Sequence, residues 1–88
     1  MSSDQFLAVA LDDEVVVLDV AQARLIQLDP WTRRVWEACD GRTDDDLAPA
    51  LSRPGRRLRE TLRILAEAGI IRHDGLRWVQ TEVRWVAT

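Results

Sequence analysis

Three short stretches near the start of the chain are rich in aliphatic and β-branched residues, with turn-forming residues between them. Residues 6–11 read FLAVAL, residues 14–20 read EVVVLDV and residues 24–28 read RLIQL. Such side chains pack well on a pleated strand, and the connections at 12–13 and 21–22 are short enough for tight turns. The pattern predicts a three-stranded antiparallel meander.

The third stretch ends at Asp29-Pro30, where we expect a helix to begin. Proline has no N–H to give to a strand ladder, but its fixed φ suits the first turn of a helix. Asp29 is a good N-cap, because its carboxylate can accept the unpaired N–H groups of that turn. We expect Gly41 to be the left-handed C-cap of this helix. Its expected buried stripe comprises Val35, Trp36 and Cys39, joined by Trp31.

A second helix is predicted directly after Thr43. This residue can cap the helix, and the aspartates at 44–46 would sit at the positive end of the helix dipole. Leu47 and Leu51 are four residues apart and should face the core. Pro49 removes a helical hydrogen bond, so the helix should be short or kinked.

The third helix is expected to run from Arg56 to Ala68 and to end at Gly69. Leucines recur along one face at helical spacing, while arginines and glutamates gather on the opposite face. Between these two faces lies a stripe with a basic head and a small, apolar body, which should border the core. The stripe consists of Arg57, Thr61, Ile64 and Ala68.

The end of the chain predicts a hairpin and an extended tail. Strand-like residues at 70–72 and 76–79 flank Asp74-Gly75, a good hairpin signal. The tail at 80–88 carries Trp85. The whole pattern predicts an α+β fold of the winged helix-turn-helix type, with a three-stranded antiparallel N-terminal sheet, three helices and a C-terminal β-hairpin. Eighty-eight residues suit a single small domain over 1–88.

Composition narrows the class of protein. A net charge of −3 weighs against a dedicated nucleic-acid binder. The chain opens with no signal-peptide pattern and has no apolar run of membrane-spanning length, so we expect a soluble, cytoplasmic protein without membrane contact. Cys39 is the single cysteine and cannot form an internal disulfide, and a buried, inert thiol is expected there.

No group of residues in the sequence points to catalysis. His73 is the single histidine and is expected in the solvated hairpin turn, and its spacing from Cys39 does not suit zinc. The aspartates at 44–46 would point in different directions on a helix, which fits a charged helix start better than a cation site. A glycine-rich phosphate loop is missing. The sequence indicates a protein that is not an enzyme and needs no cofactor or metal.

Arginines on the third helix leave a DNA-binding hypothesis open. In a helix-turn-helix protein this helix would enter the major groove, and Arg56, Arg59 and Arg63 would be exposed there. Glu60 and Glu67 share the same face and would repel phosphate, and few uncharged base-reading residues accompany them. A solvated face with ion pairs is therefore favoured, and a winged-helix DNA-binding regulator is the alternative.

Four motifs occur in a characteristic order along the chain. They are Leu-Asp-Pro at 28–30, Val-Trp at 35–36, Asp-Gly at 40–41 and a threonine-led acidic run at 43–47. Together with LRILAEAGIIR at 62–72, they resemble the PqqD-like family, the peptide-recognition domains of systems that modify ribosomally made peptides (RiPPs). The family pattern has Asn where this chain has Asp29, and both residues cap helices. The resemblance covers about residues 14–72 and leaves out the tail at 73–88.

The resemblance implies a RiPP recognition element, a non-catalytic peptide chaperone. Such a domain binds the leader region of a precursor peptide and presents it to a modifying enzyme, such as a radical-SAM protein or, in lasso peptide systems, a leader peptidase. The leader would be added as a strand to the third strand, in the cleft between that strand and the third helix. The residues expected to contact it are Arg24, Leu25, Ile26, Gln27, Leu28, Arg53, Arg57, Thr61, Ile64 and Ala68.

Some alternatives stay open at this point. Ile26 and Leu28 share a face that should point to the core, whereas Leu25 and Gln27 should point the other way. Ile64 could instead be an ordinary core residue. An open edge strand is compatible with a monomer or a homodimer. The terminal hairpin and tail could also make the protein an adaptor that docks a partner protein.

Overall fold

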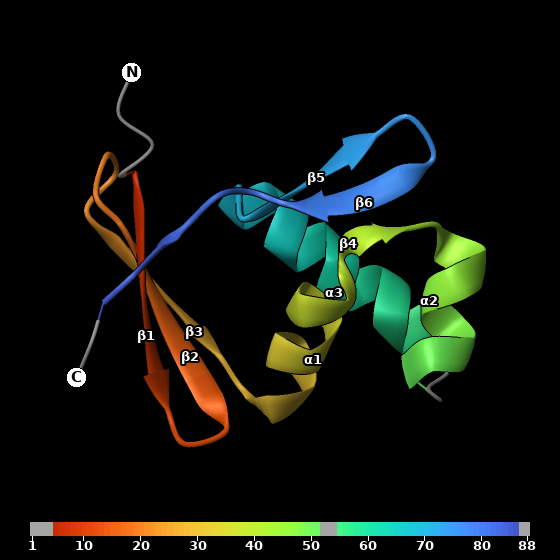
Figure 1. Cartoon of the computed structure of the whole chain (residues 1–88), viewed down its shortest axis with the longest axis horizontal. Coiled ribbons are helices and arrows are strands. Elements are labelled where there is room, and N and C mark those ends of the chain that lie inside the picture. The colour runs from red at the N-terminus through yellow and green to blue at the C-terminus, as the bar shows by residue number, and fades with distance from the viewer. Residues whose placement is uncertain (1–4, 52–54, 87–88) are drawn as a thin grey trace. The chain divides into compact units, whose positions relative to one another are not determined.

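The computed structural model of the chain describes residues 5–51 and 55–86 (Figure 1). Its elements are β1 (Phe6–Leu11), β2 (Glu14–Asp19), β3 (Arg24–Leu28), α1 (Pro30–Ala38), β4 (Asp40–Arg42), α2 (Asp44–Leu51), α3 (Gly55–Ala68), β5 (Ile71–Asp74), β6 (Arg77–Gln80) and β7 (Arg84–Trp85). The mixed α+β composition confirms the predicted class. Arg53 was expected to contact the peptide and lies outside the described residues.

The described residues fall into two compact units. Residues 5–33 and 82–86 belong to the first unit, and residues 34–51 and 55–81 belong to the second. The first unit holds a four-stranded sheet with the order β3-β2-β1-β7. The second holds α2, α3 and a three-stranded sheet with the order β4-β6-β5. The chain passes from the first unit to the second within α1.

The sheet of the first unit contains the predicted meander. β1 and β3 have the expected bounds, and β2 ends one residue earlier than expected. Antiparallel pairing joins β1 to β2 and β2 to β3 without a bulge. Side chains alternate between the two faces of a sheet. In this sheet, the side chains on one face are buried. The buried side chains on that face include Phe6, Ala8, Val15, Val17, Asp19 and Leu28.

The tail adds a fourth strand that the sequence pattern did not predict. β7 pairs in parallel with β1, so that Leu7 lies opposite Arg84 and Ala8 lies opposite Trp85. The N–H of Val86 donates to the carbonyl of Ala8 at 2.8 Å. Within the described residues, the N-terminal sheet is thus four-stranded rather than three-stranded.

The change from strand to helix at Asp29-Pro30 occurs as predicted. The N–H of Thr32 donates to Oδ1 of Asp29 at 2.7 Å, and the N–H of Arg33 donates to its carbonyl at 2.8 Å. Asp29 is therefore the N-cap of α1, and Pro30 occupies the first helical position.

The prediction that Gly41 caps the end of α1 is wrong. The helix ends at Ala38, and Gly41 lies in β4 with a φ of 104°. The guanidinium of Arg42 donates to the carbonyl of Ala38 at 3.2 Å and to Asp40 Oδ1 at 3.0 Å. A side chain, rather than a left-handed glycine, therefore covers the end of this helix.

α2 begins with a reciprocal pair of contacts between Thr43 and Asp46. The N–H groups of Asp46 and Leu47 donate to the Thr43 carbonyl at 3.1 and 3.0 Å. In return, the N–H and the hydroxyl of Thr43 donate to Asp46 Oδ2 at 3.3 and 3.0 Å. These bonds from Thr43 lower the pKa of Asp46. Pro49 lies inside the helix, which is short, as expected.

α3 ends in the predicted left-handed glycine. Gly69 has a φ of 85°, and its N–H donates to the carbonyl of Ala66 at 3.0 Å. The next N–H, of Ile70, reaches back to the carbonyl of Leu65 at 3.2 Å. This pair of bonds is a Schellman motif.

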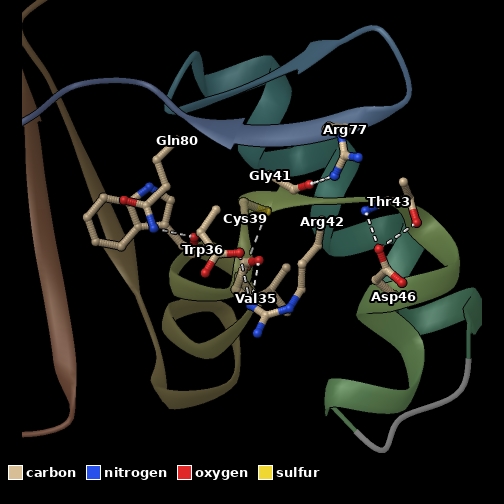
Figure 2. A network of polar contacts seen from close by, with 11 residues as sticks. Val35, Trp36, Cys39, Gly41, Arg42, Thr43, Asp46, Arg77 and Gln80 are labelled. Atoms are coloured by element: carbon tan, nitrogen blue, oxygen red, sulfur yellow. Dashed lines mark hydrogen bonds and ion pairs between the residues drawn. The ribbon is translucent and has the colours of Figure 1, made fainter.

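The core of the second unit is built around Trp36. Its indole N–H donates to the carbonyl of Ile70 at 3.2 Å, and its own carbonyl accepts a bond from Gln80 Nε2 at 2.9 Å (Figure 2). The buried side chains include Val35, Trp36, Cys39, Leu47, Leu51, Leu58, Leu62, Leu65, Ile70 and Ile71. The leucine stripe of α3 and the predicted stripe residues Val35, Trp36 and Cys39 thus lie in the core. Trp31, which was also expected in the buried stripe, is only half-buried.

The C-terminal hairpin is confirmed, with its turn one residue later than expected. Asp74 pairs with Arg77, so Gly75 and Leu76 are the two central residues. Gly75 takes a φ of 67°, which a tight hairpin of this kind requires at its first central position. His73 therefore lies in β5 rather than in the turn. Its ring stacks on the ring of Trp78, with a distance of 4.2 Å between the two ring centroids. β4 pairs with the other edge of β6, so the hairpin is part of a three-stranded sheet.

None of the helices over residues 5–51 and 55–86 is long and apolar enough to cross a membrane.

Candidate functional site

The most distinctive feature of the first unit is the outer edge of β3. β3 is the terminal strand of its sheet and, within the described residues, pairs with β2 alone. An edge strand of this kind leaves a row of N–H and C=O groups available for another strand. The edge can therefore form backbone hydrogen bonds with an extended peptide.

The side chains of β3 alternate as predicted. Leu28 is buried and Ile26 is half-buried, and their partners in β2 are the buried Val15 and Val17. Leu25 and Gln27 point to the opposite face and are exposed. Leu25 is 70% exposed, a large fraction for a leucine in a sheet. The five expected strand residues thus lie together on one open edge, and three of them, Arg24, Leu25 and Gln27, are exposed.

Two polar contacts fix β3 on its neighbour. Gln27 Nε2 donates to Glu14 Oε1 of β2 at 2.8 Å, near the end of β3 that leads into α1. At the other end of the strand, Arg24 Nη2 lies 3.7 Å from Asp19 Oδ2. Both contacts join β3 to β2, so they hold the strand in register and leave its outer backbone edge uncovered.

The sequence pattern did not single out Asp19, yet it shapes the entry to β3. This carboxylate is fully buried in the strand, and its Oδ1 accepts the N–H of Gln22 at 3.2 Å. The bond tightens the turn from 20 to 23, where Ala23 takes a φ of 52°. The available signal was an aspartate directly before a turn, because such a side chain often bonds to the backbone of the residues that follow.

The expected contact residues of the third helix all lie on α3 in the second unit, and they differ in exposure. Ile64 is 56% exposed, so it is not a core residue. Arg57 is exposed and Ala68 is half-buried. Thr61 is 7% exposed, and its hydroxyl donates to the carbonyl of Arg57 at 3.0 Å. The hydroxyl of Thr61 is thus used within the helix.

The arginine face of α3 borders two adjoining hollows within the second unit. They have volumes of about 330 and 340 Å³ and share the residues Asp44, Arg59 and Leu62. Asp45 lines one hollow, and Arg63 lines the other. Carboxylates therefore stand beside the arginines that a DNA reader would use, which is unfavourable for a phosphate backbone.

The neighbouring contacts also fit a solvated helix face. Arg56 Nε lies 3.8 Å from Glu60 Oε1, at the predicted four-residue spacing. Trp78 lines one of the two hollows, and its indole N–H donates to Asp44 Oδ1 at 2.6 Å. This bond holds the Asp44 carboxylate beside Trp78.

Cys39 has the properties of an inert thiol. It is fully buried, and its Sγ donates to the carbonyl of Val35 at 3.2 Å (Figure 2). Burial, with a contribution from the nearby Asp40 carboxylate, raises its pKa to about 12. The thiol is therefore protonated at neutral pH and unsuited to act as a nucleophile or a metal ligand.

Among the residues that the structure describes, no group of three or more His, Cys, Asp or Glu side chains could hold a metal ion. The comparisons with known proteins give no family model, no curated protein and no solved structure that matches this chain. The functional proposal therefore rests on the β3 edge and on the resemblance carried by the motifs.

Proposed function

We propose that this chain is a non-catalytic peptide-binding protein that captures the leader region of a precursor peptide as an added strand on β3. It then presents that peptide to a modifying enzyme, such as a radical-SAM protein or a leader peptidase. The observation that carries the proposal is the regular, open edge of β3 with its exposed Leu25 and Gln27. The motif resemblance supplies the class of peptide.

Within the described residues, β3 lacks several of the devices by which proteins often protect edge strands. Proline, lysine and a β-bulge are three such devices. β3 has the sequence RLIQL, without proline or lysine, and its register with β2 has no irregularity. The charged side chain in the strand, Arg24, is directed toward Asp19 of the neighbouring strand. An edge in this state is suited to accept another strand by backbone hydrogen bonding.

The family resemblance adds two finer proposals. It implies that the helices form a winged helix-turn-helix, and that the stripe on α3 is a second contact surface for the same peptide. The 56% exposure of Ile64 is compatible with such a contact, and Arg57 could pair with an acidic side chain. Strand addition on β3 does not depend on either of these proposals.

A proline scan of β3 tests strand addition. In an antiparallel edge strand the N–H groups point alternately inward and outward. Of Leu25→Pro and Ile26→Pro, one removes an inward bond to β2 and the other removes an outward donor. We expect the variant that keeps the fold to lose binding to a leader peptide encoded near the gene, measured by calorimetry. The wild-type chain should bind this peptide with a Kd of about 1 µM or tighter.

The control is a folded chain with its outward edge intact. Leu11→Thr keeps a good strand residue at an exposed position on β1, away from the β3 edge, and should retain affinity. Unchanged affinity in a proline variant whose amide spectrum shows an intact fold would contradict strand addition.

A further inference from the structure

The face of the first sheet that points away from its buried side is also apolar. We call it the second face; its aliphatic members are Leu7, Val9, Leu11, Val16, Leu18 and Leu25. Leu11 is 52% exposed and Leu25 is 70% exposed, and the other four are half-buried. Contiguous apolar patches of this kind commonly mark interaction sites.

One row of cross-strand partners on this face runs from one edge of the sheet to the other. Arg84, Leu7, Leu18 and Leu25 stand opposite one another on the successive strands β7, β1, β2 and β3. Leu7 and Leu18 have a neighbouring strand on each side and are half-buried. Leu25 has a strand on one side only, and its greater exposure is what the missing outer neighbour would cause.

The neighbouring row of cross-strand partners ends in a polar residue, rather than a leucine, at the β3 edge. Val9 and Val16 are followed on β3 by Gln27, whose amide donates to Glu14 Oε1 at 2.8 Å. The outer side of this row therefore presents an amide and a nearby carboxylate rather than an aliphatic surface. Along the β3 edge, an apolar position and a polar position lie two residues apart on one face.

A second copy of the chain is a poor occupant for the second face. A Leu or Val side chain buries on the order of 100 Å², so six fully exposed ones on each of two copies would bury about 1,200 Å². Four of the six are already half-buried, so the actual area falls below the roughly 1,000 Å² that a stable interface needs. An added strand on β3, by contrast, must place a side chain beside Leu25 because of the alternation of a sheet.

We propose that the peptide bound on β3 carries a large aliphatic or aromatic side chain next to Leu25. Two residues away, next to Gln27, it carries a hydrogen-bonding or basic side chain that can meet the Glu14 carboxylate. This inference rests on the proposed function and gives the added strand a sequence preference. The preference is read at the β3 end of the second face, by Leu25, Gln27 and Glu14, so it does not require α3.

The test uses a library of random linear peptides displayed on phage and selected against the full chain. Leu25→Thr removes the aliphatic side chain but keeps a good strand residue. Leu11→Thr is the matched control, because it makes the same change at an exposed position on the same face, on β1, away from the β3 edge. Amide NMR spectra check that both variants are folded and show which amides each selected peptide shifts.

We expect the selected peptides to share an apolar residue and a polar or basic residue at a spacing of two. Synthetic copies should bind Leu25→Thr about fivefold more weakly than wild type, the upper end of a cross-strand pair contribution. Leu11→Thr should change their affinity less than about twofold.

Two outcomes would overturn the inference in different ways. Peptides that shift the amides of β3 but lack the spacing, or lose equal affinity with both variants, would refute the sequence preference and leave strand addition standing. Failure to recover any binder, or recovery only of binders that leave β3 amides unshifted, would refute the proposed function and the preference with it.

Discussion

At the scale of single residues, Asp29 and Asp19 set the two ends of β3. Asp29 caps α1 through the N–H of Thr32 and so fixes where the strand stops. Asp19 accepts the N–H of Gln22 and so shapes the turn from which the strand starts. β3 is therefore a short strand with defined ends, and its register against β2 is fixed at both of them.

Replacing the cap tests the first of these roles. Asp29→Ala removes the acceptor for the Thr32 N–H, so we expect a loss of about 1 kcal/mol in the free energy of unfolding. Asp29→Asn should be close to wild type, because asparagine caps helices about as well as aspartate. Urea unfolding measures both variants. Equal stability of the alanine and asparagine variants would show that the side chain of Asp29 does not act as a cap.

At the scale of elements, the sequence predicted what local chemistry determines. Asp29-Pro30, Thr43 and Gly69 are signals that depend on a few neighbouring residues, and each marks a helix end in the structure. β4 and β7 were missed because their pairing partners lie far away in the chain. The sequence of β4 is Asp-Gly-Arg, which has no strand character, and pairing with β6 alone makes it a strand.

Local pattern also determined most of what could be predicted at the candidate site. The bounds of β3 and the alternation of its exposed and buried side chains followed from a pattern of period two. The position of β3 at the end of the sheet was consistent with a meander. The fourth strand, by contrast, joins the sheet beside β1, and only long-range pairing decides which edge of the sheet it occupies.

Removing β7 tests its role as an element of the sheet. A chain that ends at Thr81 lacks the β1–β7 pairing and the bond from Val86 to Ala8. We expect a loss of about 1–2 kcal/mol in the free energy of unfolding and faster amide exchange in β1. Affinity for the leader peptide should be unchanged, because β3 lies at the opposite edge. Trp85→Thr keeps the backbone pairing and is the control.

The truncation also separates two functional hypotheses. If the tail docks a partner protein, both the truncated chain and Trp85→Thr should lose that partner while stability changes only in the truncated chain. Trp85 is 51% exposed, so its side chain is accessible for such a contact. A loss of leader affinity on truncation would contradict the assignment of the peptide to β3.

At the scale of the whole molecule, the features of the two units favour peptide binding over DNA binding. The first unit offers an open strand edge with an apolar row that ends at Leu25. In the second unit, Asp44 and Asp45 line the hollows beside Arg59, and Arg56 is paired with Glu60. The total charge of −3 adds to the repulsion of phosphate.

Strand addition on β3 can be observed by following the backbone amides of the chain while the leader peptide is added. If the peptide adds to β3, alternate N–H groups of residues 24–28 become protected from hydrogen exchange, and backbone contacts appear between β3 and the peptide. Arg84 and Trp85, at the opposite edge of the sheet, should show no such contacts. Tight binding with unchanged exchange throughout residues 24–28 would contradict the claim that the peptide adds to β3.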